Sequence, residues 1–184
     1  MPNYSERLHY YYGQLLSVED LTAEQDYFLE KRRLHNRLLH GWGVVEGLHV
    51  NPANTAWTVT VGPGYAIDRF GDEILVQSAQ LATIPSHCRG KATHTLYVVI
   101  RYKETLTRPA PALAAGTDTI EYTRWRDDFE IALPEHPPDH NEAEASSQQN
   151  RTGAGIVLGS VTADSAGKIT THHCPLRRHL RRDS

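Results

Sequence analysis

The sequence has few cysteines, no long apolar run and no excess of positive charge. Its 184 residues contain only two cysteines, Cys88 and Cys174, which excludes a disulfide framework and predicts free thiols. No apolar run approaches the roughly 20 residues that span a bilayer, and no apolar stretch follows the charges near the N-terminus. We therefore expect no direct membrane insertion, no secretory signal, and synthesis and assembly in the cytoplasm. The formal net charge of -3 disfavours nucleic acid as a partner, because phosphate binding requires local positive charge.

An aromatic arm and one helix are expected within residues 1–40. The arm is rich in large apolar side chains that fit no single helix face: Tyr10, Tyr11, Tyr12, Leu15 and Leu16. We therefore predict an extended segment here, which either contacts a neighbouring subunit or covers the protein's own sheet. Ser17 with Asp20, or Thr22 with Gln25, is suited to cap the helix that follows.

The helix is expected to end at a rigid corner. Residues 23–40 are almost all good helix formers, with acidic residues early and basic residues late, which suits the helix dipole. Gly41 is placed to end the helix, because glycine adopts a left-handed backbone without strain. Trp42 is expected to bury a large area over the base of the sheet, and Gly43 to let the chain turn sharply into the first strand. These three residues predict a structural junction between helix and sheet.

Beyond residue 43 the period of the sequence changes from helical to strand-like. Short runs rich in Val, Ile, Thr and Tyr alternate with turn signals such as NPANT, GPG, RFGDE and DSAG, and two polar or Pro-rich segments, 105–119 and 134–155, interrupt them. This pattern predicts an α+β, mainly β fold, with the N-terminal arm and one long helix packed on a small antiparallel β-sandwich or open barrel. The expected divisions are an arm and helix over 1–40, a body over 41–175 with a long polar loop at 134–155, and a basic tail over 176–184.

Two histidine–cysteine pairs are the best candidates for chemistry. His87 with Cys88, and His173 with Cys174, offer the nitrogen and sulfur ligands that zinc prefers. Their spacing argues against a site, because adjacent ligands do not easily chelate one ion and neighbours in a strand point to opposite faces. The glycine-rich run GWGVVEG follows a helix and enters a strand, the reverse of a dinucleotide-binding motif. We therefore expect no catalytic residue, no bound metal and no cofactor, and the protein is predicted not to be an enzyme.

Basic side chains gather at two places that are candidates for binding partners. The helix carries a group suited to an acidic face of a neighbouring subunit: Arg32, Arg33 and Arg37. The C-terminus carries a second group: Arg177, Arg178, Arg181 and Arg182. No aromatic residue is interleaved with this second group and the chain is acidic overall. A solvated tail, or one docked on a protein partner, is therefore favoured over phosphate binding.

The first half of the chain resembles a known group of structural proteins. The run YYYGQLLSVEDLTAEQDYFLEKRRLHNRLLHGWGVVEGLHV, followed by VTVGPGYAIDRFGDEILV, is similar to small proteins encoded with bacteriophage tails and with phage-tail-like contractile injection systems. The shared pattern, over Tyr10–Val76, is an aromatic stretch with Gly-Gln-Leu-Leu, a helix ending in Gly-Trp-Gly-Val-Val, and a Pro-Gly hairpin with an Asp-x-x-Gly turn. This resemblance implies an adaptor subunit of the cap or baseplate at one end of the tail, and it assigns no catalytic residues.

Three functions follow as expectations. The first is a non-enzymatic structural adaptor, present in several copies of a symmetric particle, that links the tail tube or sheath to its terminal complex. Its expected partners are sheath, tube, cap or baseplate proteins. The second is a surface-binding or fibre-attachment module of the same particle, in which the polar loop at 134–155 carries recognition. The third and least favoured is a metal-dependent hydrolase built on the histidine–cysteine pairs.

Overall fold

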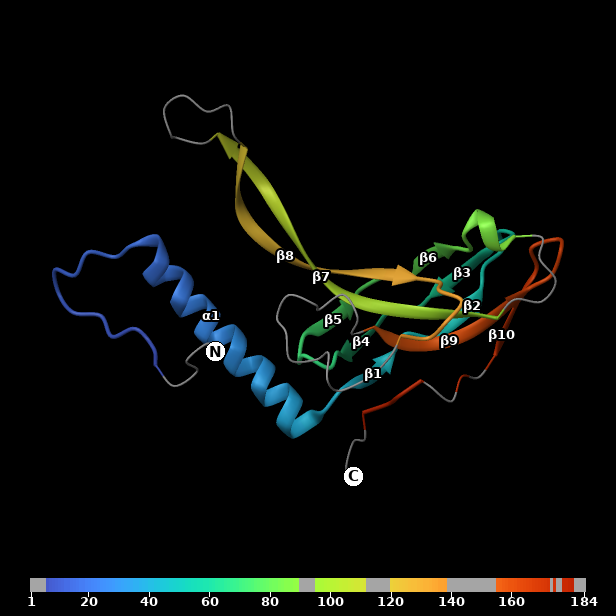
Figure 1. Cartoon of the computed structure of the whole chain (residues 1–184), viewed down its shortest axis with the longest axis horizontal. Coiled ribbons are helices and arrows are strands. Elements are labelled where there is room, and N and C mark those ends of the chain that lie inside the picture. Colours follow the sequence, from blue (N-terminus) through green and yellow to red (C-terminus); the bar gives the residue numbers. More distant parts are fainter. Residues whose placement is uncertain are drawn as a thin grey trace.

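The computed structural model describes residues 6–89, 95–111, 120–138, 155–172, 174 and 177–180. In this part of the chain, one α-helix stands beside a body made of three antiparallel sheets (Figure 1). This arrangement confirms the expected α+β, mainly β class. Among these residues, no helix combines the length and the apolarity that crossing a membrane would demand.

The helix α1 spans Val18–His35 and begins at a complete capping box. The Ser17 hydroxyl accepts from the backbone N–H of Asp20, and the Asp20 carboxylate accepts from the backbone N–H of Ser17 at 3.0 Å. The first of the two predicted caps is therefore the one that the chain uses. One further turn, η1 (Asn36–His40), has π-helical hydrogen bonding and ends at Gly41, whose positive φ of 75°, with ψ at -150°, is a conformation that favours glycine as predicted.

The body consists of two three-stranded sheets and one four-stranded sheet. The first contains, in spatial order, β1 (Gly43–Gly47), β4 (Gly64–Ile67) and β5 (Glu73–Val76). The second contains β2 (Val50–Pro52), β3 (Thr58–Val61) and β6 (Gln80–Thr83). The third contains β10 (Ile169–His172), β9 (Ile156–Ala163), β7 (Thr95–Pro111) and β8 (Ile120–Ala132). A short 3-10 helix, η2 (Ser86–Cys88), lies between β6 and β7 in the sequence.

The turn and hairpin predicted around residues 63–76 are both present. The Asp-x-x-Gly turn is confirmed: the Asp68 carboxylate accepts from the backbone N–H groups of Phe70 and Asp72, at 2.9 and 2.8 Å. The Pro-Gly hairpin that contains this turn is confirmed as well: β4, which begins at Gly64 directly after Pro63, pairs antiparallel with β5. Strand β3 pairs instead with β2 and β6, so Gly62 and Pro63 carry the chain from one sheet into another.

One core cluster joins residues from all three sheets. Leu96, Val98 and Ile100 alternate along β7 into this cluster. Val99 points the other way and packs with Val157 and Cys174 in a smaller cluster. Buried residues run through β9 without interruption from Ile156 to Val161, so this strand is covered on both faces. The third sheet therefore lies between the main core cluster and the smaller cluster that contains Cys174.

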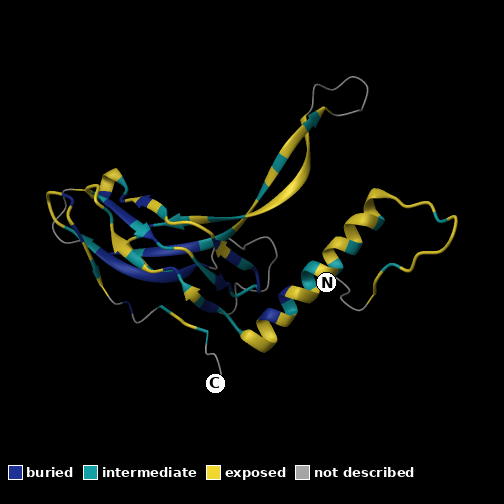
Figure 2. Cartoon of the chain, turned by 180° about the vertical axis from the view of Figure 1, so that it is seen from behind, coloured by how far each residue is buried: buried dark blue, intermediate teal, exposed yellow. Residues whose placement is uncertain are grey.

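Helix α1 is attached to the body through polar contacts near its C-terminal end. The Asn36 side-chain amide donates to the carbonyl of Gly71 at 2.9 Å and to the carboxylate of Glu73 at 3.1 Å. A Cβ at Gly71 would lie 2.2 Å from the carbonyl oxygen of Arg33, so only glycine allows the turn to approach the helix this closely. Most of the remaining helix surface is exposed (Figure 2).

Strands β7 and β8 form a hairpin that projects far beyond the body (Figure 1). Their pairing runs from Val99 opposite Ala132 to Pro111 opposite Ile120. Residues 121–127 of β8 are all exposed, whereas the first residues of β7, around Leu96–Ile100, lie in the core. The sequence did not predict this hairpin, because the Pro-, Ala- and Gly-rich segment 105–119 was interpreted as an interruption between strands.

Candidate partner interface

The described part of the arm does not cover the protein's own sheet. Tyr11 is 68% exposed, and Tyr12 and Leu15 are almost completely exposed. Tyr10 is held differently: its hydroxyl donates to the Glu24 carboxylate of α1, and this hydrogen bond raises the pKa of the tyrosine. The alternative in which the tyrosines serve the chain's own core is therefore wrong for Tyr11 and Tyr12. The arm itself loops away from the body ahead of the helix (Figure 1).

The helix α1 and the turn η1 carry further exposed apolar side chains. They are Val18, Leu21, Phe28, Leu38 and Leu39. The helical spacing of Tyr27, Phe28, Leu34 and Leu38 predicts that these four apolar side chains share one face of the helix. Instead, Tyr27 and Leu34 are half-buried, while Phe28 and Leu38 remain exposed. The apolar residues of α1 therefore do not form a single stripe directed at the body.

The projecting hairpin carries apolar side chains on both of its faces. Leu106 and Trp125 lie directly opposite each other on one face, and Trp125 is 64% exposed. Ile120 and Tyr122 lie on the other face, because their positions on β8 differ from that of Trp125 by an odd number. A two-stranded ribbon with both faces in water is marginally stable by itself. Aromatic side chains displayed in this way are typical anchors of protein interfaces.

A groove of about 840 Å³ lies between the end of the helix and the first sheet. Its lining is mixed, with Arg32, His35, Asn36, Leu39, His40, Val45, Tyr65, Ile67, Glu73 and Leu180. Burial of the Tyr65 ring, followed by repulsion from the Glu73 carboxylate, raises the pKa of Tyr65 to about 12. The groove thus offers a concave surface next to the exposed apolar residues of η1.

Arg33 does not belong to the partner-facing set. Its side chain is 5% exposed and donates to three carboxylates, those of Asp72, Glu30 and Glu104, at 2.5, 2.7 and 3.2 Å. Burial works against the charged form, but the charge of Asp72 and the hydrogen bond to Glu30 outweigh it and raise the pKa of Arg33. The prediction that Arg33 selects a partner is therefore corrected: it fastens the helix to the body. Arg32 and Arg37 remain exposed.

Arg177 is half-buried and is also bound to the body. Its guanidinium donates to the carbonyl oxygens of Gly47, Leu48 and Leu158, at 2.6, 2.8 and 2.8 Å. This fork of donors pins the C-terminal segment across two sheets, and desolvation by burial lowers the pKa of Arg177. The segment 177–180 is therefore part of the body and not a solvated tail. Arg181 and Arg182, together with residues 139–154 of the polar loop, lie outside the described residues.

The junction at Gly41–Gly43 is built around the C-terminal segment. The Arg178 guanidinium lies 4.5 Å from the centre of the Trp42 ring, and that of Arg69 lies 5.5 Å from it. Trp42 is thus half-buried, and its ring contacts two cations. The Val44 N–H donates to the Arg178 carbonyl, and a Cβ at Gly43 would lie 2.6 Å from that oxygen. A close backbone approach therefore requires Gly43.

The structure separates the two histidine–cysteine pairs. Cys88 belongs to the main core cluster, whereas Cys174 packs in the smaller cluster with Val99 and Val157. His173 lies outside the described residues. The zinc set first considered from these two pairs is therefore not assembled by the described residues.

Comparison with known proteins gives similarity at the level of the fold. No family model matches the chain, and no match is found among curated proteins. A chain in the TssK-TssF-TssG baseplate subcomplex of the type VI secretion system matches with a TM-score of 0.52 and 12% identity, over 91% of this chain and 60% of that one. The crystal structure of TssK matches with a TM-score of 0.52 and 10% identity, over 91% and 40%.

A third structure, the baseplate complex from the type VI secretion system, matches with a TM-score of 0.50 and 10% identity, over 91% of this chain and 57% of the matched chain. The present chain thus spans between 40% and 60% of the length of these three chains. It shares its fold with TssK and with chains in two structures of the type VI secretion system baseplate. Nearly all of the present chain takes part in that likeness.

Proposed function

We propose that this protein is a non-enzymatic structural subunit of the baseplate of a contractile injection system, assembled in the cytoplasm. The observation that carries the proposal is the fold match, which extends over 91% of the chain and is found in two baseplate structures and in the crystal structure of TssK. The sequence resemblance to adaptors of phage-tail-like particles covers the arm, the helix and the first strands. Both lines of support point to the same kind of particle, and the structures favour its baseplate end over its cap.

The subunit acts by geometry and by buried apolar area. The arm and the β7–β8 hairpin reach away from the body, and both display aromatic residues that the described part of the chain leaves uncovered. The body between them is held rigid by the Arg33 and Arg177 contacts. In this proposal, the two projections insert into neighbouring subunits and link the tail tube or sheath to the terminal complex.

The test is cryo-electron microscopy of particles purified with this protein tagged, and again with its gene deleted. Tagged density at the baseplate end, and particles without a baseplate after deletion, are the expected results. A complete particle that lacks only a peripheral knob would favour the surface-binding or fibre-attachment module instead. Absence of the tagged protein from the particles would overturn the proposal.

A second experiment separates binding from folding in the arm. Changing Tyr11→Ser and Tyr12→Ser together should abolish incorporation into particles while leaving the melting temperature unchanged, because both side chains are exposed in the isolated chain. The matched control is Leu81→Ser, which removes an equally exposed apolar side chain from β6 of the body. Normal incorporation of the tyrosine variant would exclude the arm from the interface.

A further inference from the structure

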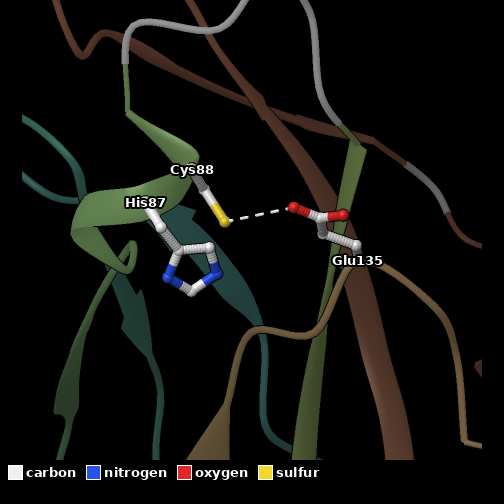
Figure 3. A group of neighbouring side chains, drawn as sticks. All are labelled: His87, Cys88 and Glu135. Atoms are coloured by element: carbon white, nitrogen blue, oxygen red, sulfur yellow. Dashed lines mark hydrogen bonds between the residues drawn. The ribbon is translucent and has the colours of Figure 1, made fainter.

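Three potential metal ligands from two distant parts of the sequence converge at one edge of the body. They are the imidazole of His87, the thiol of Cys88 and the carboxylate of Glu135, and one ligand atom from each lies within 4.8 Å of the other two. Figure 3 shows the Cys88 side chain pointing toward the Glu135 carboxylate, with the His87 ring beside it. Cys88 is 5% exposed, whereas His87 and Glu135 are accessible to solvent.

The local backbone explains how adjacent residues reach one point. His87 and Cys88 lie in the 3-10 helix η2, where the Cys88 N–H donates to the Pro85 carbonyl at 3.0 Å. Neighbouring side chains of such a turn do not point to opposite faces, as they would in a strand. The sequence-based objection to adjacent ligands therefore does not apply to this pair.

The third ligand is also positioned by the backbone. Glu135 follows Leu133, which is buried in the core just after β8, and Pro134, whose carbonyl accepts from the Tyr97 N–H at 2.9 Å. Both sides of the cluster are thus attached to fixed elements of the body. The cluster joins the connection between β6 and β7 to the end of β8.

We propose that His87, Cys88 and Glu135 form a zinc site with three protein ligands and a water molecule in the fourth position. Tetrahedral zinc, with bonds of about 2.3 Å to sulfur and about 2.0 Å to oxygen, holds those two ligand atoms about 3.5 Å apart. The Cys88 Sγ and Glu135 Oε1 atoms are 3.5 Å apart, joined by a hydrogen bond in which the thiol donates. The pair already has the spacing that the ion requires.

Binding exchanges one proton for the ion. Zn²⁺ replaces the hydrogen that Cys88 shares with Glu135, and the thiol proton is released to solvent. The resulting thiolate and carboxylate each carry one negative charge, and with neutral His87 they balance the two positive charges of zinc. A mixed nitrogen, sulfur and oxygen set favours zinc over calcium or magnesium, which prefer oxygen ligands alone. This inference is independent of the role proposed above in the particle.

The test uses the full chain, purified with a chelator and a non-thiol reductant and then titrated with Zn²⁺ and with Co²⁺. We expect one zinc per chain and a thiolate-to-cobalt charge-transfer band in the near ultraviolet. Cys88→Ser should abolish that band, and Cys174→Ser, the other buried cysteine, should retain it. Glu135→Gln, at an exposed position that does not threaten folding, should weaken zinc binding at least about tenfold, since loss of an outer-shell partner alone costs roughly 10–100-fold.

Each alternative result contradicts the site. Less than stoichiometric zinc in the wild-type chain would overturn it, and so would a cobalt band that survives Cys88→Ser. A band lost in Cys174→Ser but kept in Cys88→Ser would move the thiolate to the other cluster. His87→Ala removes a proposed ligand and should weaken zinc binding. His49→Ala is its matched control, because it removes an exposed imidazole from another loop and should leave zinc affinity unchanged.

Discussion

The Nε of Arg33 lies 2.5 Å from an Oδ1 of Asp72, at a point where the two side chains are 5% and 2% exposed. One residue comes from the helix and the other from the turn that begins β5, so this ion pair sets the direction in which the helix leaves the body. Glu30 and Glu104 complete the surroundings of the guanidinium, and Glu104 belongs to the projecting hairpin. A single buried cation therefore connects the helix, the body and the hairpin.

Replacing Arg33 with methionine should destabilise the protein strongly. The change keeps the apolar stem but leaves the buried Asp72 carboxylate without its cation, which typically costs about 3–5 kcal/mol. Equilibrium unfolding in urea measures this difference. Arg32→Met is the control, because Arg32 is 46% exposed and its contact with Glu73 is 3.8 Å long; it should change stability by less than about 1 kcal/mol. Equal effects of the two substitutions would contradict the central role of Arg33.

The two glycines of the helix–sheet junction should respond differently to alanine. At Gly43, the φ is 139° and a Cβ would meet the Arg178 carbonyl oxygen at 2.6 Å, so both strain and collision oppose the change. We expect Gly43→Ala to cost at least about 2 kcal/mol. At Gly41, the nearest atom to a Cβ is a Leu180 methyl carbon at 3.7 Å, and only the φ of 75° opposes alanine. Gly41→Ala should therefore cost roughly 1 kcal/mol in the same urea measurement.

Because the Arg177 guanidinium donates to three backbone carbonyls, replacing Arg177 should lower the free energy of unfolding far more than replacing its neighbour Arg178. Arg177→Met removes the donors to three backbone carbonyls and should destabilise the chain by about 3 kcal/mol, since hydrogen bonds from a charged group contribute roughly 1.5–3 kcal/mol. Arg177→Lys should restore only part of this, because lysine lacks the planar fork. Arg178→Met removes an exposed stack on Trp42 and should cost about 0.5–1 kcal/mol. Thermal and urea unfolding of the three variants distinguish these outcomes.

Tyr65 makes stability depend on pH in the alkaline range. Its pKa is raised from 10.0 to about 12, first by burial and then by Glu73, so the folded state keeps this proton to higher pH than the unfolded state does. Its contribution is therefore complete below about pH 10 and is lost as the pH rises from 10 to 12, by at most about 2 kcal/mol. Urea unfolding at pH 8.5 and pH 11 should show a smaller loss for Tyr65→Phe than for the wild type. An identical loss would contradict the assignment to Tyr65.

The elements that depend on local chemistry could be predicted from the sequence. The capping box at Ser17, the left-handed Gly41 and the Asp68 turn all follow from interactions between residues close in sequence. The strand-rich body followed in the same way from the short runs of Val, Ile, Thr and Tyr that alternate with turn residues. These signals fixed the α+β, mainly β class without any knowledge of the tertiary contacts.

The features that depend on distant partners could not be predicted in the same way. Arg33 looked like any other basic residue at the end of a helix, and only Asp72, 39 positions away, makes it internal. Arg177 likewise finds two of its three carbonyl acceptors about 130 residues earlier in the chain. Nothing local showed that Thr105–Pro111, in a segment interpreted as an interruption between strands, would pair with β8 beyond the body.

The projecting hairpin provides the sharpest separation of assembly from folding. Leu106 and Trp125 form one exposed cross-strand pair, and such a pair contributes about 0.2–1 kcal/mol to a sheet. Changing both to serine should therefore lower stability by no more than about 1 kcal/mol. If the hairpin inserts into a neighbouring subunit, the same change should remove an aromatic anchor worth at least about 2 kcal/mol of binding, roughly a 30-fold loss of affinity.

Incorporation into purified particles, measured beside urea unfolding of the free chain, gives both quantities for this variant. Leu81→Ser again controls for the general effect of removing an exposed leucine, here from the body sheet. Stable but unincorporated protein is the expected result for the hairpin variant. A variant that enters particles as the wild type does would show that the hairpin's apolar faces are not buried by a neighbour. The link to neighbouring subunits would then have to come from the arm and the groove beside η1.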